Sequence, residues 1–101
     1  MIDAQITTGQ ITLLSVGKDM HSPNIHVAGL FSTLKIGGNY TIEPNSRVDE
    51  IETLGPSGIF RNITIGGRMD GNISASVSLG RHTVGNKSGT GKFYLDGVQV
   101  P

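Results

Sequence analysis

Residues Gly58–Gly67 read Gly-Ile-Phe-Arg-Asn-Ile-Thr-Ile-Gly-Gly, and residues Gly29–Gly38 read Gly-Leu-Phe-Ser-Thr-Leu-Lys-Ile-Gly-Gly. Both stretches share the pattern Gly-aliphatic-Phe-x-x-aliphatic-polar-Ile-Gly-Gly, and the offset from Gly38 to Gly67 defines a 29-residue step. Two further glycines repeat at nearly the same spacing but with weaker sequence similarity around them: Gly9 precedes Gly38, and Gly97 follows Gly67, by almost the same step. A fixed period of this length is typical of a supersecondary unit that stacks on copies of itself.

Short apolar-polar-apolar alternations recur along the whole chain. Period-two alternation of β-branched residues predicts half-buried strands. The longest example, Ile73–Leu79, is predicted to turn Ile73, Ala75, Val77 and Leu79 inward and three serines outward. The shorter examples are Ile11–Leu13, Ile25–Val27, Leu34–Ile36, Tyr40–Ile42, Ile63–Ile65 and Val98–Val100.

One segment, Arg47–Leu54, carries a helical signal. Ser46 is a suitable N-cap and Asp49 stands at the capping-box position. Val48, Ile51 and Leu54 would then face the core, and Gly55-Pro56 would end a helix of at most two turns.

Two all-β architectures fit short strands with a 29-residue repeat. In a β-solenoid, or β-helix, equivalent strands stack in parallel, and glycines take the corner conformations with positive φ. In a β-sandwich, the alternative, the strands pair as hairpins with the glycine pairs in tight turns. The repeated Gly-aliphatic-Phe corner favours the solenoid, because stacking would place Phe31 against Phe60 and Ile36 beside Ile65.

Length and composition exclude several classes of protein. The 101 residues are predicted to form a single all-β domain over residues 1–101, with 28 Ile, Leu, Val and Phe residues available for a core. Eight basic and eight acidic residues cancel, so the electrostatic footprint of a nucleic-acid-binding protein is missing. Cysteine is absent, and neither a signal peptide nor an apolar run long enough for a membrane span is predicted.

A solenoid of about three repeats would have two open ends, and neither terminus resembles a cap. Val98–Val100 reads as a strand followed directly by Pro101. We therefore expect the chain to assemble with copies of itself or to belong to a longer protein. Charge is also asymmetric: Glu43, Asp49, Glu50 and Glu52 lie mid-chain, and basic residues dominate from Arg61 onward. This asymmetry either aligns subunits or forms a solvated surface.

The stretch Gly85–Lys92 superficially resembles a phosphate-binding loop. Asn86 stands where that motif needs its first glycine, and Phe93 stands where it needs Ser or Thr. The following residues, Phe93–Leu95, read as a strand, so no helix N-terminus is predicted to hold a phosphate. A loop before the last strand is the preferred interpretation.

Three histidines, His21, His26 and His82, are the candidate metal ligands. His21 and His26 are spaced so that an extended strand places them on opposite faces. Without cysteine, a site within one chain would be incomplete, although three imidazoles on a threefold axis would make a good ligand set. Exposed or hydrogen-bonded histidines without metal are the expectation.

No catalytic constellation is predicted. The chain has no Gly-x-Ser-x-Gly motif, and the carboxylates of Glu43, Asp49, Glu50 and Glu52 form a short polar cluster with no sign of burial. We therefore expect no enzymatic activity, no catalytic residues and no cofactor. The sequons at Asn39, Asn62, Asn72 and Asn86 fit the asparagine-at-turn composition of a β-repeat. The outward serines Ser74, Ser76 and Ser78 suggest a hydroxyl-rich face that could bind sugars.

Two resemblances add to this reading. Phe60–Gly67 and Gly91–Val100 resemble β-helical segments of bacteriophage tail spikes and tail fibres, which are elongated homotrimers at the virion's contact with the host. Gly66–Ala75 resembles the repeat of bactofilins, β-solenoids that polymerise end to end in bacteria. Bactofilin repeats are shorter and more regular than a 29-residue step, and neither family supplies a binding or catalytic residue for this chain.

The sequence thus predicts a non-enzymatic, β-repeat structural module of a virion or cell surface. The tail resemblance implies a homotrimer in the virion tail, with host-surface glycan or other virion proteins as partners. A bactofilin-like, self-polymerising scaffold in the bacterial cytoplasm or at the cell surface is the first alternative. A carbohydrate-binding module is the second.

Overall fold

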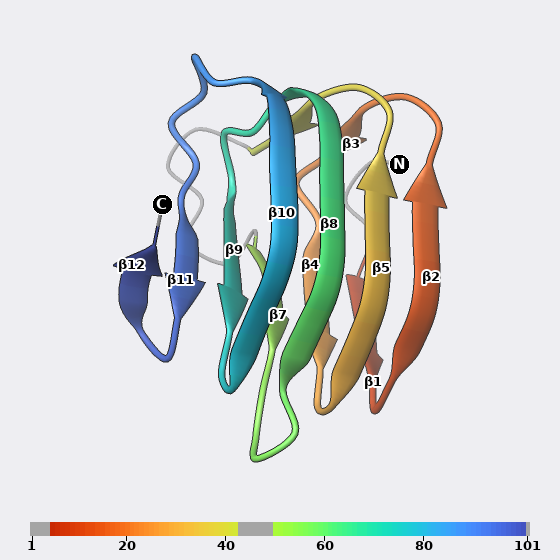
Figure 1. The fold of residues 1–101 in the computed structure, drawn as a ribbon. Coiled ribbons are helices and arrows are strands. Elements are labelled where there is room, and N and C mark those ends of the chain that lie inside the picture. The colour runs from red at the N-terminus through yellow and green to blue at the C-terminus, as the bar shows by residue number, and fades with distance from the viewer. Residues whose placement is uncertain (1–4, 43–49, 101) are drawn as a thin grey trace.

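The computed structural model describes residues 5–42 and 50–100, which wind through about four turns of a β-solenoid (Figure 1). The first strands of successive coils form one sheet, in the order β1 (Gln5–Thr8), β4 (Asn24–Val27), β7 (Glu50–Thr53), β9 (Asn72–Ala75) and β11 (Phe93–Leu95), and β12 (Val98–Val100) is added at its edge. A second sheet has the order β10 (Ser78–Asn86), β8 (Ile59–Arg68), β5 (Leu30–Ile36) and β2 (Ile11–Val16). The third side pairs β3 (Met20–His21) with β6 (Tyr40–Thr41), and Tyr40 bridges on to Met69.

Every described strand pair is parallel except β11 with β12. A sandwich of hairpins would instead pair its consecutive strands antiparallel. The predicted solenoid is therefore confirmed over the sandwich.

The repeated motif of Gly29–Gly38 and Gly58–Gly67 occupies equivalent positions on neighbouring coils. β5 and β8 pair with Phe31 beside Phe60 and Ile36 beside Ile65, as the 29-residue spacing predicts. The other coils of this sheet are markedly shorter, because Phe31 also pairs with Ile11 and Phe60 also pairs with Leu79. The 29-residue offset between β5 and β8 is therefore the length of one shorter coil plus the extra residues between β6 and β7.

Gly9 and Gly97, the two weaker matches to the 29-residue spacing, do not occupy positions equivalent to Gly38 and Gly67. Gly9 lies beneath Gly29, not at the level expected from Gly38, because a methyl group on Gly29 would lie 2.6 Å from the carbonyl oxygen of Gly9. Gly97 lies in the turn between β11 and β12, where the chain leaves the solenoid path. Equal spacing fails to align these glycines because the length of the coil differs from turn to turn.

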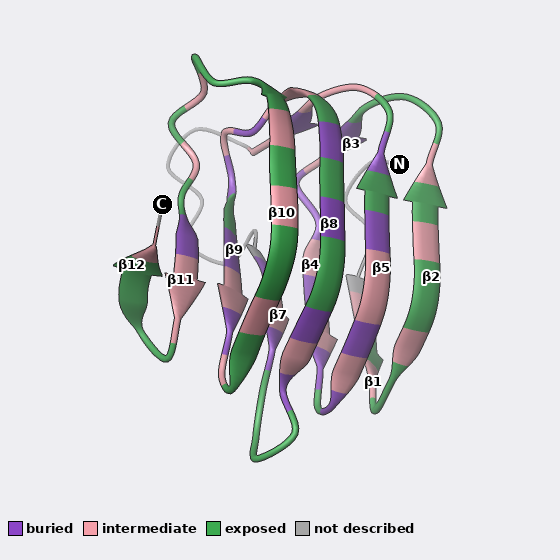
Figure 2. Cartoon of the chain, in the orientation of Figure 1, coloured by how far each residue is buried: buried purple, intermediate pink, exposed green. Residues whose placement is uncertain are grey.

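Buried residues recur at matching levels of neighbouring strands (Figure 2), so the core consists of columns along the solenoid axis. One column of the second sheet is Leu14, Leu34, Ile63 and His82, and the next is Val16, Ile36, Ile65 and Val84. Phe31 and Phe60 are fully buried between Ile11 and Leu79. The remaining buried apolar residues are Met20, Ile25, Val27, Tyr40, Ile51, Met69, Ile73, Ala75 and Phe93.

The predicted strict alternation of inward-facing and outward-facing residues fails at two places. Leu13 is 61% exposed, because two residues separate the inward positions Ile11 and Leu14 in β2. Val77 is 47% exposed and Leu79 is half-buried, although both were predicted to face the core with Ile73. The chain turns a corner after Ala75, so Leu79 belongs to β10 on the next face and Val77 lies on the corner itself.

The predicted helix Arg47–Leu54 is wrong in its second half, and Arg47–Asp49 lie outside the described residues. Glu50–Thr53 form β7, which is paired on both sides, with β4 and with β9. Ile51 is buried between Ile25 and Ile73, whereas Leu54 is 41% exposed. Ladder bonds to two neighbouring coils and the burial of Ile51 outweigh a local capping signal.

Glycines form a second kind of column, where the second sheet ends and the chain turns towards the third side. Gly17 and Gly37 directly follow β2 and β5, and Gly66 and Gly85 lie among the last residues of β8 and β10. A methyl group on Gly37, Gly66 or Gly85 would lie 2.4, 2.4 or 2.2 Å from the carbonyl oxygen of the glycine one coil earlier. Positive φ was predicted for corner glycines, but among the described glycines only Gly55 and Gly97 adopt it. Close approach between coils, and not backbone handedness, requires the glycines of this column.

Candidate functional site

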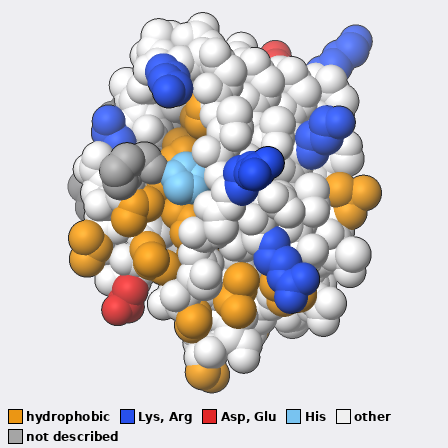
Figure 3. Space-filling view, in the orientation of Figure 1, with side chains coloured by type: hydrophobic (Ala, Val, Ile, Leu, Met, Phe, Trp, Pro, Cys, Tyr) orange, Lys and Arg blue, Asp and Glu red, His pale blue; other side chains and the backbone are white. Residues whose placement is uncertain are grey.

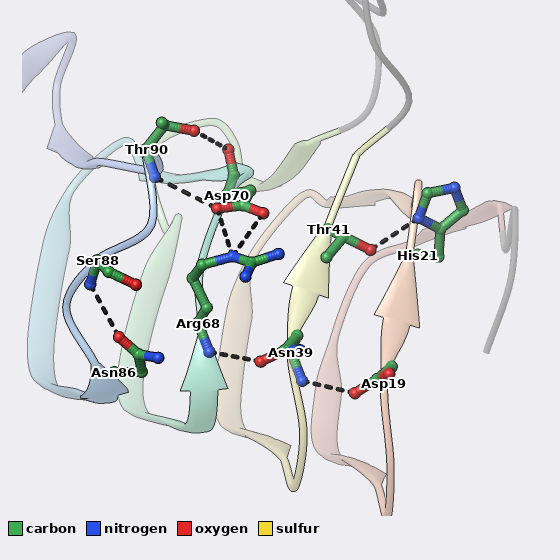
Figure 4. Close-up of polar contacts among 9 residues, drawn as sticks. All are labelled: Asp19, His21, Asn39, Thr41, Arg68, Asp70, Asn86, Ser88 and Thr90. Atoms are coloured by element: carbon green, nitrogen blue, oxygen red, sulfur yellow. Dashed lines mark hydrogen bonds and ion pairs between the residues drawn. The ribbon is translucent and has the colours of Figure 1, made fainter.

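Polar side chains on the third side link one coil to the next (Figure 4). Asp19 Oδ1 accepts a hydrogen bond from the Asn39 backbone N–H at 2.8 Å, and Asn39 Oδ1 accepts one from Arg68 N–H at 2.7 Å. Arg68 Nε then donates to the Asp70 carboxylate, at 2.9 Å from Oδ2. Thr90 N–H continues to Asp70 Oδ1 at 3.3 Å. These side chains hold the coils in register.

The candidate metal ligands His21, His26 and His82 lie on β3, β4 and β10, three different sides of the solenoid. His21 Nδ1 is hydrogen-bonded to Thr41 Oγ1 at 2.7 Å. Within the described residues, no group of three His, Cys, Asp or Glu side chains is arranged to hold a metal ion.

His26 lies between two polar side chains on the first sheet. Its Nδ1 lies 2.5 Å from Glu52 Oε1, and its Nε2 contacts Asn24 Oδ1. Both ring nitrogens are thus engaged within the chain. Of the acidic cluster singled out in the sequence, Glu52 pairs with this histidine, whereas Glu43 and Asp49 lie outside the described residues.

The loop that resembled a phosphate-binding motif connects β10 to β11 across the third side. Asn86 Oδ1 accepts a hydrogen bond from Ser88 N–H at 3.0 Å, so the loop begins with an Asx turn. A methyl group on Gly89 or on Gly91 would lie 2.2 Å from the carbonyl oxygen of Met69 or of Gly71. The glycines therefore permit close packing on the preceding coil. The strand predicted after this loop is confirmed as β11.

The same loop borders a cavity of about 290 Å³ at the C-terminal end of the core. Met69 and Phe93 line the cavity together with His82 and Val84, and the His82 ring lies 4.4 Å from the Phe93 ring, centroid to centroid. The remaining lining residues are Asn86, Lys87, Gly89, Gly91 and Lys92. Hydrophobic side chains are visible beside β10 in this region (Figure 3).

The cavity arises because the stacked columns stop there. His82 and Val84 end two columns of the second sheet, and the Met20–Tyr40–Met69 column of the third side is followed by Gly89–Gly91. Sequence reasoning missed this site. The available signal was the alignment of Leu79–Gly85 with Phe60–Gly66, which places His82 at the core position of Ile63.

Lys and Arg side chains are spread over the outer face of the second sheet (Figure 3). Lys35, Arg61 and Arg81 are exposed on the adjacent strands β5, β8 and β10. Thr64 is paired with Lys35 on one side and with Thr83 on the other, and β2, β5, β8 and β10 contain no acidic residue. This arrangement makes a flat cationic surface.

The predicted serine face does not form as one surface. Ser74 belongs to β9, Ser78 begins β10, and Ser76 at the corner between them donates a hydrogen bond to the Gly55 carbonyl oxygen at 2.8 Å. The three hydroxyls therefore lie around a corner.

Three comparisons, with protein families, with curated proteins and with solved structures, gave no match. Residues 5–42 and 50–100 include no helix with the length and hydropathy needed to span a membrane.

Proposed function

We propose that this chain is a non-enzymatic structural module of a virion or cell surface, and specifically a bacteriophage tail-associated module that works as a homotrimer. The observation that carries the proposal is the continuous stacking of about four parallel coils through side-chain columns and hydrogen-bonded side chains. Such a unit transmits force along its axis, because each coil is bonded to the next on three sides. The role is mechanical.

Exposed apolar side chains at one corner supply a contact surface for the trimer. Ala28, Leu54 and Val77 lie at the corner between the first and second sheets in consecutive coils, and all three are exposed. Leu54 is 41% and Val77 is 47% exposed. Burying this ridge against two other copies would remove it from water.

The experiment that tests this proposal is the solution mass by multi-angle light scattering across a wide range of concentrations. A constant mass of three times 10.6 kDa is expected. Leu54→Ser combined with Val77→Ser should shift the mass toward the monomer, and Leu13→Ser, on the outer face of β2, is the matched control. A monomer at every concentration would contradict the proposal.

The self-polymerising, bactofilin-like alternative in the bacterial cytoplasm or at the cell surface is weaker, for a steric reason. End-to-end stacking would place β2 of a second copy on β10, and β1 of that copy would then lie on β9. β11 already occupies that position. Open-ended growth in the same light-scattering experiment would nevertheless favour this alternative.

A second candidate function, carbohydrate binding at a host surface, is favoured by the cationic outer face of the second sheet. Lys35, Arg61 and Arg81 suit an acidic polysaccharide, because carboxylate or sulfate groups could pair with them and sugar hydroxyls with the threonines. Alginate is a suitable probe for affinity electrophoresis. Retention should fall with salt and with Arg61→Glu plus Arg81→Glu, and equal retention by the neutral polymer dextran would overturn it.

A further inference from the structure

The chain leaves the solenoid path immediately after β11. This strand pairs in parallel register with β9, Phe93 beside Ile73 and Leu95 beside Ala75, so it begins a fifth coil. In each earlier coil the equivalent strand leads around a corner into the second sheet. Here Asp96 and Gly97 have φ of 51° and 77°, and β12 returns antiparallel to β11. Two consecutive residues with positive φ are typical of a tight hairpin turn.

The hairpin leaves a strand position beside β10 that none of residues 5–42 and 50–100 fills. β10 (Ser78–Asn86) is a long edge strand, paired with β8 on one side and with no described strand on the other. Edge strands with free N–H and C=O groups are templates for strand addition. The end cavity lies beside this position, because His82 and Val84 of β10 line it.

The cavity has the lining expected for an apolar side chain from such an added strand. In the earlier coils, the positions that continue the His82 and Val84 columns are filled by Leu14 and Val16, by Leu34 and Ile36, or by Ile63 and Ile65. A fifth-coil strand would place its own apolar side chains above His82 and Val84, between Met69 and Phe93. The volume of about 290 Å³ is enough for large side chains.

The charge of the cavity rim indicates a further property of the segment that would bind there. Lys87 and Lys92 are exposed and line the cavity, and no lining residue is acidic. The nearby Asp70 carboxylate is held by Arg68 Nε and by Thr90 N–H. A carboxylate on the occupant, at the end of the added strand next to Asn86 and Lys87, would be complementary to this rim.

A second copy of this chain does not fit without rearrangement. Its free edge strand β2 is joined to β1 by only Gly9 and Gln10, and β1 would need the place that β11 occupies. A strand that is free on both sides, such as an extended segment of a different protein, meets this requirement.

We propose that β10 and the end cavity bind an extended segment of another protein as an added parallel strand, with apolar side chains in the cavity and a carboxylate beside Lys87 and Lys92. Main-chain hydrogen bonds to β10 supply affinity, and the cavity supplies selectivity. The inference does not depend on the trimer, because the apolar corner ridge and the β10 edge are different surfaces.

A synthetic peptide taken from this chain is the sharpest probe. Residues 30–37, with a free C-terminus, carry the side-chain spacing that stacks on these columns: Phe31 would lie above Leu79, Leu34 above His82 and Ile36 above Val84. Gly37 would lie above Gly85, so the terminal carboxylate would approach Lys87. Controls are the same peptide with an amidated C-terminus and a scrambled peptide.

We expect calorimetry to give saturable binding of the free-acid peptide to the full chain, with a Kd on the order of 100 µM. Amidation should weaken binding about fivefold, as for an exposed ion pair, and Lys87→Glu should abolish that difference or reverse it. Val84→Phe should fill the cavity and weaken binding by at least about tenfold, whereas Thr83→Phe, on the outer face, should not. Amide exchange should slow in β10 and stay unchanged in the other edge strand, β2.

Several results would overturn the inference. Equal binding of the scrambled peptide, protection of β2 instead of β10, or no binding at millimolar peptide would each exclude the site. Concentration-dependent association of the chain alone, with protection of β10, would show that the occupant is a second copy. Because the mass of the peptide-free chain is measured separately, loss of the trimer and loss of peptide binding can be distinguished.

Discussion

Phe31 and Phe60 stack face to face across two coils, with ring centroids 4.7 Å apart and ring planes inclined by 28°. Both rings are fully buried, and they occupy paired positions in β5 and β8. The two residues that repeat most conspicuously in the sequence are therefore direct neighbours in the core. Their contact shows that the 29-residue spacing spans one turn of the solenoid.

Truncation of either ring should cost similar stability. Phe31→Ala and Phe60→Ala are each expected to lower the free energy of unfolding by about 3–5 kcal/mol, because each leaves a cavity the size of a buried ring. Urea unfolding followed by circular dichroism gives both values. Leu13→Ala, at a 61% exposed position, is the control and should change little. A loss near zero at one phenylalanine and a large loss at the other would argue against equivalent positions.

The corner glycines should respond to a methyl group according to their place in the column. Gly66→Ala is expected to destabilise the fold by more than about 1 kcal/mol, because its Cβ would lie 2.4 Å from the Gly37 carbonyl oxygen and the coils would have to separate. Gly17→Ala is the matched control, since nothing lies within 4 Å of its Cβ at the end of the same column. Thermal unfolding of both variants measures the contrast, and equal effects would contradict the close-approach explanation.

The contribution of the Asn39 side chain to stability should come from its Oδ1 atom alone. Asn39→Ala leaves the Arg68 N–H without the acceptor that now lies 2.7 Å away, at an expected cost of about 1–2 kcal/mol. Asn39→Asp keeps an acceptor oxygen and should retain most of the stability. Chemical denaturation of the three proteins tests this, and identical losses for the alanine and aspartate variants would show that the hydrogen bond is not the cause.

The hairpin turn that ends the solenoid should be sensitive at Gly97. Its φ of 77° is strained for a residue with a Cβ, so Gly97→Val is expected to weaken the β11–β12 pairing. Gly9→Ala, where nothing lies within 4 Å of the added Cβ, is the control. Amide exchange in Val98–Val100 should accelerate in the valine variant while β4 and β5 remain protected. Unchanged exchange in β12 would mean that the turn does not hold the hairpin.

The sequence predicted the fold where neighbouring coils share a recognisable sequence motif. Phe31 and Phe60, followed in both stretches by Ile-Gly-Gly, revealed that β5 and β8 are equivalent. The shorter basic coil could not be recognised in the same way, because Ile11 and Leu79 replace phenylalanine in the flanking coils. The extra segment between β6 and β7 then made the enlarged step appear to be the period.

Other features depend on contacts that no local pattern encodes. Ile51 lies in a strand because Ile25 and Ile73 flank it from the preceding and the following coil, a relationship that a helix-capping signal cannot reveal. The end cavity is defined by the point where the columns stop, and the turn at Asp96 and Gly97 decides that point. The polar residue His82 in a column of aliphatic residues was the one local sign of it.

The measurement that tests the account most directly is a cysteine cross-link across the coil register, which is clean because the native chain contains no cysteine. Thr33 and Asn62 are paired neighbours on the outer face of β5 and β8, so Thr33→Cys with Asn62→Cys should form an intramolecular disulfide under mild oxidation. Lys35→Cys with Asn62→Cys, which is out of register, should remain reduced. Efficient cross-linking of the mismatched pair with failure of the paired one would contradict the stacked-coil arrangement on which both proposals rest.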